Sequence, residues 1–340
     1  MNINKAQIIV VVLGILIVAG GIFSYNKSTD SFKEIFSKVS AELASKEFIR
    51  ERVDGIFTVK DDELSALNNL PAGVYPKIHF SLDQVVSTDA GILLGGTKPY
   101  LSNIRILLED FANDPVLFAA EVISMPKDML LYVKLNELSG FPMDLSSIKG
   151  KWWRMDLKAL VKNLGGTESD DILKAVEQGG IPNVSKEERQ EQLAIVEKYE
   201  NAARIKKLGD GQIEGSPSYR FSITLEKTEL KNMLTELLGV IVKNAGEGQK
   251  VDALEIAAGI EDALQMIDIH NIELLVHKEN YLPIQVKSSI EISDETGKNT
   301  GTMDLSVIID GASPVEIKAP ANSTDFMYLF SNLMTGMEIK

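Results

Sequence analysis

The chain has 340 residues, with 49 acidic and 35 basic side chains and no cysteine. Without cysteine there are no disulfides, no thiolate nucleophile and no cysteine-ligated metal. The net charge of −14 disfavours nucleic acid as a partner, because like charges repel at long range.

An uncharged apolar run lies near the N-terminus, from Ile8 to Tyr25. About 20 helical residues cross a bilayer core, so this run is long enough for a single span. Lys5 precedes it and no acidic side chain occurs before Asp30, which favours a cytoplasmic N-terminus. We therefore expect a membrane anchor, with the rest of the chain outside the cytoplasm. A cleaved signal peptide is the alternative, because small residues occur at Val18-Ala19-Gly20-Gly21.

The anchor divides the chain into three parts. Residues 1–28 form a cytoplasmic stub and a transmembrane helix, residues 29–330 form an extracytoplasmic α+β domain, and residues 331–340 form a tail. The large domain is either one unit or two sub-units around a helical segment at 156–210, since about 300 residues are enough for either arrangement.

Helical periodicity first appears directly after the anchor. Phe32, Ile35, Val39 and Leu43 share one face of a helix predicted over Ser31–Glu51, and Ser31 with Glu34 forms a capping box. Similar signals predict further helices over Asp156–Asn163, Asp170–Gln178, Ser185–Lys207, Leu230–Val242 and Val251–Met266.

A period of two predicts the strands. They are expected at Ile78–Asp83, Ile104–Glu109, Val116–Ser124, Met129–Leu135, Lys151–Leu157, Tyr219–Glu226, Asn271–His277, Ile284–Ile292, Met303–Ile309 and Val315–Ala319. Their alternation of apolar and polar residues is typical of antiparallel sheets with one solvated face. We therefore predict an α+β fold, in which an N-terminal transmembrane helix precedes a large curved antiparallel sheet with helices packed on its concave face.

Residues capable of catalysis or metal binding are sparse. There are three histidines, and His270 and His277 lie seven positions apart in or near one predicted strand. In a regular strand this odd spacing places them on opposite faces, where they cannot bind one metal ion. Serine does not occur in a Gly-x-Ser-x-Gly context, and adjacent acids such as Asp170-Asp171 are expected by chance among 49 acidic residues.

Two short segments have a superficial likeness to ligand loops. Gly91–Lys98 lacks the Gly-Lys-Ser/Thr order of a phosphate loop, because Thr97 precedes Lys98. Asp294-Glu295-Thr296-Gly297 lacks the ligand spacing of an EF-hand and is better interpreted as a hairpin turn. We therefore expect no enzyme activity, no metal site and no cofactor.

Both tryptophans of the chain lie in Lys151-Trp152-Trp153-Arg154. Neighbouring residues of a strand point to opposite faces, so we expect one indole in the core and the other at the surface or at a rim. An amphipathic ring at a rim is suited to the mouth of a ligand pocket.

The order of these elements resembles a known family. The chain begins with a helix and one-sided strands, followed by Lys-Trp-Trp-Arg-Met-Asp after Ile148-Lys149-Gly150. A strand and helix at Tyr219–Val242 come next, and the closing strands include "YLPIQVKSSIEIS". This order resembles bacterial envelope proteins of the LolA/LppX-type lipoprotein fold. The resemblance covers residues 75–320. It implies a half-open antiparallel barrel, closed by helices around a hydrophobic cavity, that binds acyl chains or another apolar ligand.

Two functions remain open at this point. The first is a membrane-anchored, non-catalytic binding protein that holds a lipid, an acyl chain or a lipidated protein between sheet and helices, with Leu230–Val242 as a lid or plug. Its candidate pocket residues are Trp152, Trp153, Phe221, Met233, Leu234, Leu237, Leu238 and Ile241. The second is a structural or protein-interaction module of the cell envelope, whose apolar faces are all used in its own core.

Overall fold

The computed structural model describes residues 30–68, 70–87, 99–109, 116–139, 148–164, 190–191, 194–195, 198–199, 203–244, 253–294 and 296–328. The predicted anchor at 8–25, the loop at 91–98, the helix at 170–178 and the tail at 331–340 lie outside these residues. Among the residues that are described, no helix combines the length and apolar character needed to cross a membrane.

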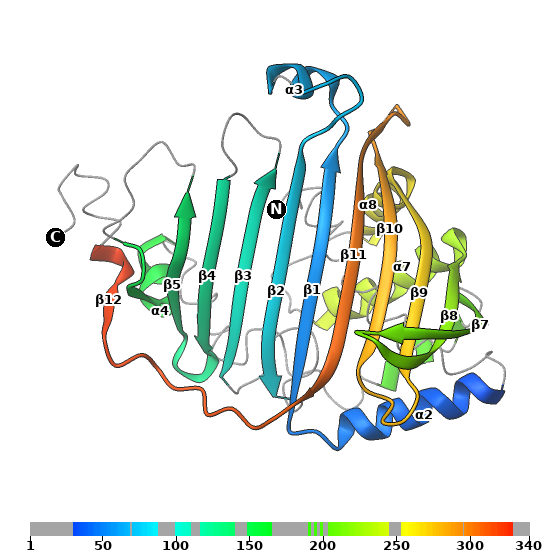
Figure 1. Cartoon of the computed structure of the whole chain (residues 1–340), viewed down its shortest axis with the longest axis horizontal. Helices are drawn as coiled ribbons and strands as arrows, with labels where there is room; N and C mark the ends of the chain where they lie inside the picture. The colour runs from blue at the N-terminus through cyan, green and yellow to red at the C-terminus, as the bar shows by residue number, and fades with distance from the viewer. Residues whose placement is uncertain are drawn as a thin grey trace. The chain divides into compact units, whose positions relative to one another are not determined.

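The described elements give an α+β fold with a mostly antiparallel sheet (Figure 1). The strands are β1 (Phe48–Val59), β2 (Lys77–Ser87), β3 (Tyr100–Glu109), β4 (Val116–Met125), β5 (Leu130–Ser139), β6 (Trp152–Asp156), β7 (Ala203–Ile213), β8 (Ser216–Leu225), β9 (Ile267–His277), β10 (Ile284–Ser293), β11 (Asn299–Ala312) and β12 (Ser323–Asp325). Their order in the sheet is β12-β6-β5-β4-β3-β2-β1-β11-β10-β9-β8-β7. The short β12 pairs with β6 in parallel.

The helices are fewer than the strands. They are α2 (Asp30–Ala44), α3 (Asp62–Leu67), α4 (Leu157–Leu164), α7 (Lys227–Asn244) and α8 (Ala253–Met266), with a 3₁₀ turn, η2, at Pro126–Asp128. The chain divides into two compact units. The first comprises Met1–Leu43 and Pro182–Asp304, and the second comprises Ala44–Ile181 and Leu305–Lys340.

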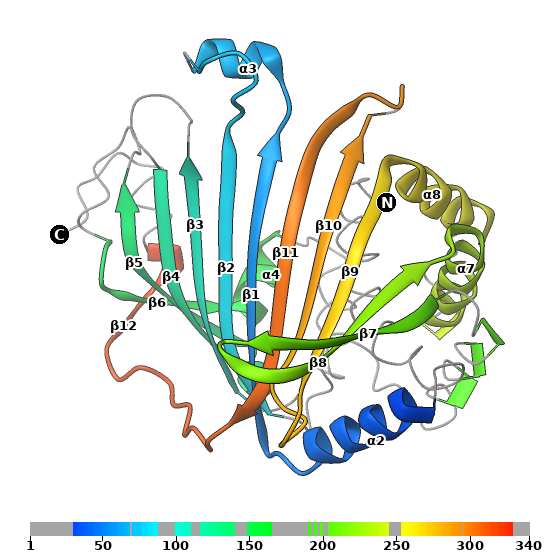
Figure 2. The same ribbon diagram turned by 45° about the vertical axis from the view of Figure 1, so that its right-hand side comes forward.

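In the first unit, three helices pack against β7, β8 and β9. Phe32 of α2 meets Phe221 of β8 edge to face, with ring centroids 4.8 Å apart and planes at 84°. Both side chains are almost completely buried. Further members of this core are Ile35, Val39, Ala203, Ile223, Leu230, Met233, Leu234, Ile260, Leu264, Leu274 and Val276. Figure 2 shows α7 and α8 beside β9, with the β7–β8 hairpin crossing in front of that strand.

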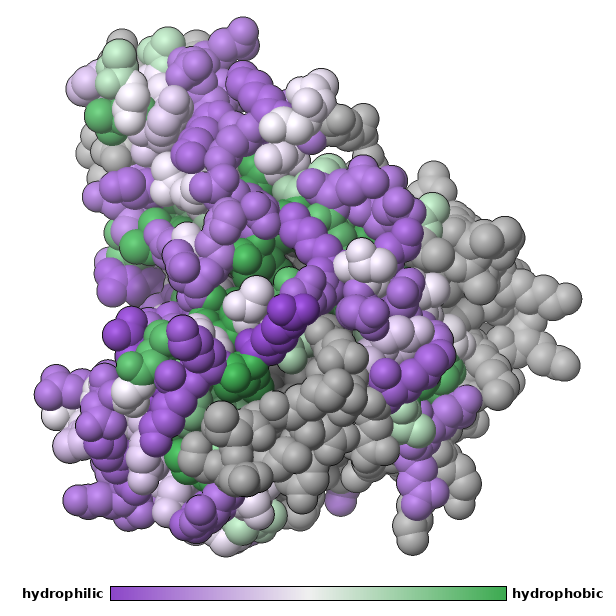
Figure 3. All heavy atoms as spheres, turned by 90° about the vertical axis from the view of Figure 1, so that its right-hand side faces the viewer, coloured by the Kyte–Doolittle hydropathy of each residue, from purple (hydrophilic) through white to green (hydrophobic). Residues whose placement is uncertain are grey.

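The surface around this core is polar. In the view of Figure 3, hydrophilic side chains predominate and hydrophobic residues are visible in small groups between them. Ion pairs link neighbouring elements there, including Arg220 with Glu273 and Lys231 with Glu261. These pairs join exposed side chains, so each contributes little to stability.

In the second unit, β1 to β6 form antiparallel neighbours in chain order. A small core lies at the β6 end, where Ile148 and Trp153 are buried with Leu135, Leu138 and Phe326 packed against them. A bulge between Ala119 and Ala120 shifts the register of β4 against β5.

Three strands, β1, β7 and the short β12, were not predicted, and helices expected from the local sequence overlap the first two. The predicted helix at 31–51 ends at Ala44, and residues 48–59 form β1 instead. Likewise the predicted helix at 185–207 is wrong in its last turn, because β7 begins at Ala203. Both segments are rich in charge and gain their strand conformation from pairing, β1 with β2 and β7 with β8. The strand expected at 315–319 is also wrong, since these residues are irregular.

The prediction that His270 and His277 lie on opposite faces of one strand is wrong, because β9 contains a bulge. β9 has an extra residue between His270 and Glu273, because these pair with Ser289 and Lys287 of β10. Asn271, with a φ of 51°, lies within this bulge. The bulge reverses the alternation, so His270 and His277 share a face of β9. Each has its own local contact: His270 with Asp268, and the Nδ1 of His277 with the backbone N–H groups of residues 279 and 280.

The segment around Asp294 is the predicted hairpin turn between β10 and β11. The Asp294 carboxylate accepts hydrogen bonds from the Thr296 hydroxyl and from the backbone N–H groups of Thr296 and Lys298, at 2.6, 2.8 and 3.1 Å. These bonds lower the pKa of Asp294 below its ordinary value. All of these contacts lie within the turn, so the carboxylate closes the hairpin.

Replacing Phe32 tests the packing of α2. Phe32→Ala removes a fully buried ring that fills the space over Phe221, and we expect the free energy of unfolding to fall by about 3–5 kcal/mol. Phe36→Ala, at a half-buried neighbour on the same helix, is the control and should cost about 1–2 kcal/mol. Urea unfolding followed by far-ultraviolet circular dichroism measures both, and equal losses would contradict the packing described.

Candidate functional site

Strands β1 to β6 present one apolar face. The register places alternate side chains of each strand on this face, and most of them are half-buried. We call it the apolar face; its apolar members include Val53, Phe57, Ile78, Phe80, Leu82, Val86, Ile104, Ile106, Phe118, Val122, Leu131, Val133, Leu135 and Trp153. Gly55 belongs to it as well, because a Cβ atom there would lie 2.1 Å from the Phe80 ring.

One cross-strand row of the apolar face begins with polar residues. Glu51, Gln84 and Ser102 are register partners on β1, β2 and β3. The same row continues with Val122, Val133 and Trp153 on β4, β5 and β6. It is therefore polar at the β1 end and apolar at the β6 end, and we call it the graded row.

Hydrogen bonds connect the polar half of the graded row. The Ser102 hydroxyl donates to Gln84 Oε1 at 3.3 Å, and Gln84 Nε2 donates to Glu51 Oε2 at 2.5 Å. Glu51 is only 8% exposed. Burial raises the pKa of Glu51 above its ordinary value, and the hydrogen bond from Gln84 offsets part of this rise.

The opposite face of the same strands carries charge. Arg50 donates to Asp83 at 2.7 Å, and His79 pairs with Glu109. The Arg50 hydrogen bond is the main reason why the pKa of Asp83 lies below its ordinary value. The sheet in this unit therefore has one apolar and one charged face.

The two tryptophans separate as the sequence predicts. Trp153 lies on the apolar face, 3% exposed, and its Nε1 donates to the Ile148 carbonyl at 3.2 Å. Trp152 is half-buried on the charged face, where Lys134 Nζ lies 5.6 Å from its ring centroid.

The remaining predicted pocket residues lie in the first unit. Phe221, Met233 and Leu234 are fully buried in its core, and Leu237 packs against that core. Leu238 and Ile241 belong to α7, but their side chains lie outside the described part of the structure. The structure thus brings together Phe221, Met233, Leu234 and Leu237 and places the two tryptophans in the other unit. As ligand contacts, all eight stay a prediction.

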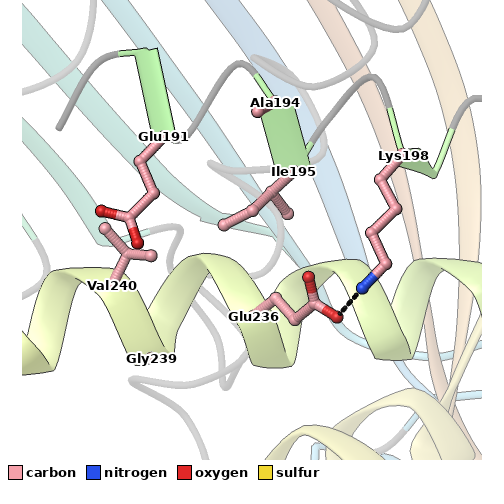
Figure 4. Close-up of a pocket in the computed structure, with 7 residues that line it drawn as sticks. All are labelled: Glu191, Ala194, Ile195, Lys198, Glu236, Gly239 and Val240. Atoms are coloured by element: carbon pink, nitrogen blue, oxygen red, sulfur yellow. Dashed lines mark hydrogen bonds and ion pairs between the residues drawn. The ribbon is translucent and has the colours of Figure 1, made fainter. Parts of the chain in front are cut away.

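The first unit also contains an open groove of about 400 Å³ beside α7 (Figure 4). Its lining consists of Glu191, Ala194, Ile195, Lys198, Glu236, Gly239 and Val240. Lys198 and the Tyr199 hydroxyl both donate to Glu236 Oε1, at 2.5 and 2.6 Å. These bonds, with that from Lys198 the stronger, lower the pKa of Glu236 below its ordinary value. The groove is solvent-exposed, and Lys198 and Glu236 in its lining are already paired with each other.

The chemistry that the apolar face supports is the binding of apolar groups. Within the described ranges, no three histidine, cysteine or acidic side chains are placed to hold a metal ion. The apolar face offers an extended hydrophobic surface with one buried carboxylate, an arrangement that can hold an apolar molecule and orient a polar group.

Glu51, Gln84 and Ser102 were not predicted as site residues. Glu51 lies in the strand that was predicted as the end of a helix, and the polar residues of β2 and β3 each interrupt an apolar alternation. Only the pairing of the three strands shows that the interruptions coincide.

Comparison with known proteins gives likeness in fold. No family model matches the chain, and no curated protein matches it significantly. Among solved structures, LprF from Mycobacterium bovis is 15% identical with a TM-score of 0.34, covering 87% of this chain and 100% of its own. The lipoprotein LppX from Mycobacterium tuberculosis is 11% identical with a TM-score of 0.32, covering 86% and 100%. The solved structures that the chain is similar to thus include proteins of the LolA/LppX type that the sequence resembles.

The buried carboxylate of Glu51 predicts a pH-dependent stability. The pKa of Glu51 is raised in the folded chain. Between the ordinary pKa and this raised pKa, the folded state therefore binds more protons than the unfolded state. The free energy of unfolding falls as pH rises through that interval. Glu51→Gln removes this loss. We expect the variant to be more stable than the wild type at pH 7, with the difference vanishing near pH 3.5.

Urea unfolding at both pH values measures this difference. Glu63→Gln, at an exposed position of α3, is the matched control and should show no comparable dependence. A Glu51→Gln variant less stable than the wild type at pH 7 would contradict the burial argument.

Gly239 gives a test of the groove. Among the described residues, no atom lies within 4 Å of the position that a Cβ atom would take there, and glycine in a helix interior is less favourable than alanine. Gly239→Ala should raise the free energy of unfolding by about 0.5–1 kcal/mol. Gly211→Ala, whose Cβ would lie 2.7 Å from Leu275 Cδ2, should instead lower it. Thermal unfolding of both variants distinguishes open from filled space.

Proposed function

We propose that this chain is a membrane-anchored, extracytoplasmic, non-catalytic binding protein that holds a lipid or acyl chain on the apolar face of β1–β6. The observation that carries the proposal is the half-buried state of so many apolar side chains on one side of these strands. Contact with water costs such a surface about 25 cal/mol per Å², and an apolar ligand removes that cost.

The distribution of burial in the second unit supports this assignment. Its buried residues form a described cluster at the β6 end around Ile148 and Trp153, and Ile49, Ala120 and Tyr132 are among the others that are buried. Phe80, Ile104 and Val122, further along the face, remain partly accessible. A ligand on these residues would therefore contact side chains that the described core does not bury.

The first unit is less suited to a ligand between sheet and helices. Phe221, Met233 and Leu234 are 0% exposed, and Phe32 of α2 occupies the space over Phe221. A ligand at these residues would require α2 to leave the core. We therefore place the ligand in the second unit, where Trp153 is the predicted pocket residue that belongs to the apolar face.

The anchor and the location rest on the sequence. The uncharged run at residues 8–25 has the length of a single span, and its flanking charges place the following domain outside the cytoplasm. An anchor of this kind would keep the apolar face close to a membrane surface, which is the source of lipid.

A structural or protein-interaction module of the cell envelope is the second candidate. The dense core of the first unit favours it, because there the chain's own helices cover the apolar side of β8 and β9. Under this alternative a lipidated or apolar partner protein, and not a free lipid, would contact the apolar face.

Substitution on the two faces of β4 tests the proposal. Val122 and Ile123 are half-buried neighbours that point to opposite faces. Val122→Gln places an amide without a partner on the apolar face, at a cost of about 1–3 kcal/mol, and should reduce bound lipid about tenfold. Ile123→Gln is the matched control and should retain wild-type binding. Native mass spectrometry of the full chain, recovered from membranes, measures the retained lipid.

Two results would overturn the proposal. One is a folded wild-type chain that retains no lipid and takes up none from added vesicles, whether these contain phospholipid alone or phospholipid with diacylglycerol. The other is an equal loss of lipid in both variants, which would mean that the binding does not depend on the apolar face.

A further inference from the structure

The graded row has the polarity of an amphiphile. Neighbouring strands lie about 4.8 Å apart, so Glu51 to Ser102 spans about 10 Å and Ser102 to Trp153 about 14 Å. The first distance is occupied by hydrogen-bonding side chains and the second by valines that end at a buried indole. A molecule that lies along the row, across the strands, therefore meets a polar end and an apolar end.

The hydrogen bonds of the polar end all point towards the Glu51 carboxylate. Ser102 donates to Gln84, and Gln84 donates to Glu51 Oε2. Among the described residues, Gln84 is the one hydrogen-bond partner of this carboxylate, so Oε1 keeps its lone pairs available. Oε1 is not among the described buried atoms that lack a partner, so it keeps contact with solvent and a donor from outside the chain can reach it.

We infer that the graded row is the orienting subsite for the ligand, that Glu51 Oε1 accepts a hydrogen bond from a hydroxyl group of that ligand, and that the acyl chain lies across Val122 and Val133 towards Trp153. This inference rests on the proposed function and specifies its ligand class, an acylated glycerol with a free hydroxyl.

The hydrogen bonds within the graded row determine that the ligand must supply a hydrogen-bond donor. Gln84 already uses Nε2 on Glu51 and Oε1 on Ser102, so the remaining capacity next to the apolar half is chiefly that of an acceptor. A carboxylate or phosphate group would bring a second negative charge to Glu51 and be repelled. A hydroxyl satisfies the carboxylate and adds no charge, and the half-buried valines beyond it match a hydrocarbon chain.

Two probes with the same acyl chain test the inference. Monooleoylglycerol has two hydroxyl donors and methyl oleate has none. Each is added to the full chain in a zwitterionic detergent that lacks hydroxyl groups, and bound ligand is counted by native mass spectrometry. We expect the wild type to bind monooleoylglycerol about tenfold more tightly than methyl oleate, as one hydrogen bond to a charged group allows.

Variants at residue 51 assign this preference. Glu51→Met keeps the length of the side chain and removes its oxygens, so it should bind both probes equally. Asp54→Met, which removes an exposed acid from the opposite face of β1, should keep the tenfold preference. Thermal unfolding confirms that each variant is folded, and an apolar replacement of a buried ion is often tolerated.

The outcomes separate the two proposals. A wild type that binds both probes equally, or a Glu51→Met variant that keeps the preference, overturns the orienting subsite while the binding function stands. A folded wild type that binds neither probe overturns the proposed function, and the subsite with it.

Discussion

The antiparallel register of β1 to β6 is the constraint on which the candidate site depends. A slip of one residue between any two of these strands would turn an entire set of apolar side chains to the charged face. Several local features fix the register. Arg50 and Asp83 join β1 to β2 on the charged face, and Gly55 leaves room for the Phe80 ring on the apolar face. The bulge in β4–β5 pairing keeps Leu135 and Leu138 on the same side, where both pack against the cluster of Ile148 and Trp153.

Local periodicity predicted the parts of the fold whose own residues alternate cleanly. Strands β2 to β6 and β8 to β11 lie at the positions expected from a period of two, and α7 and α8 at those expected from a helical repeat. β1 and β7 were missed because charged residues and glycines interrupt their apolar faces. Their strand conformation comes from partners distant in sequence, with β1 pairing with β2 and β7 with β8. Tertiary pairing there overrides a local preference for helix.

The candidate site was harder to predict than the fold for the same reason. Trp153 could be found, because a pair of tryptophans on a strand must place one indole on each face. Glu51, Gln84 and Ser102 could not, since each is a single polar residue within its own strand. They are recognised as one polar group only when the three strands are paired and the residues become neighbours in one row. The histidines illustrate the converse: one inserted residue at the β9 bulge invalidates a face assignment that a regular strand would make certain.

The polar half of the graded row is not explained by folding energy. Glu51 is largely removed from water, and the hydrogen bond from Gln84 only partly compensates for the desolvation, so an apolar residue of similar size would cost the folded state less. The core of the first unit, in contrast, is built from apolar side chains such as Phe32, Phe221 and Met233. A carboxylate retained on the apolar face of the second unit is therefore best understood through something it contacts outside the chain. A hydroxyl donor on an apolar ligand would satisfy the carboxylate and cover the neighbouring valines in a single binding event.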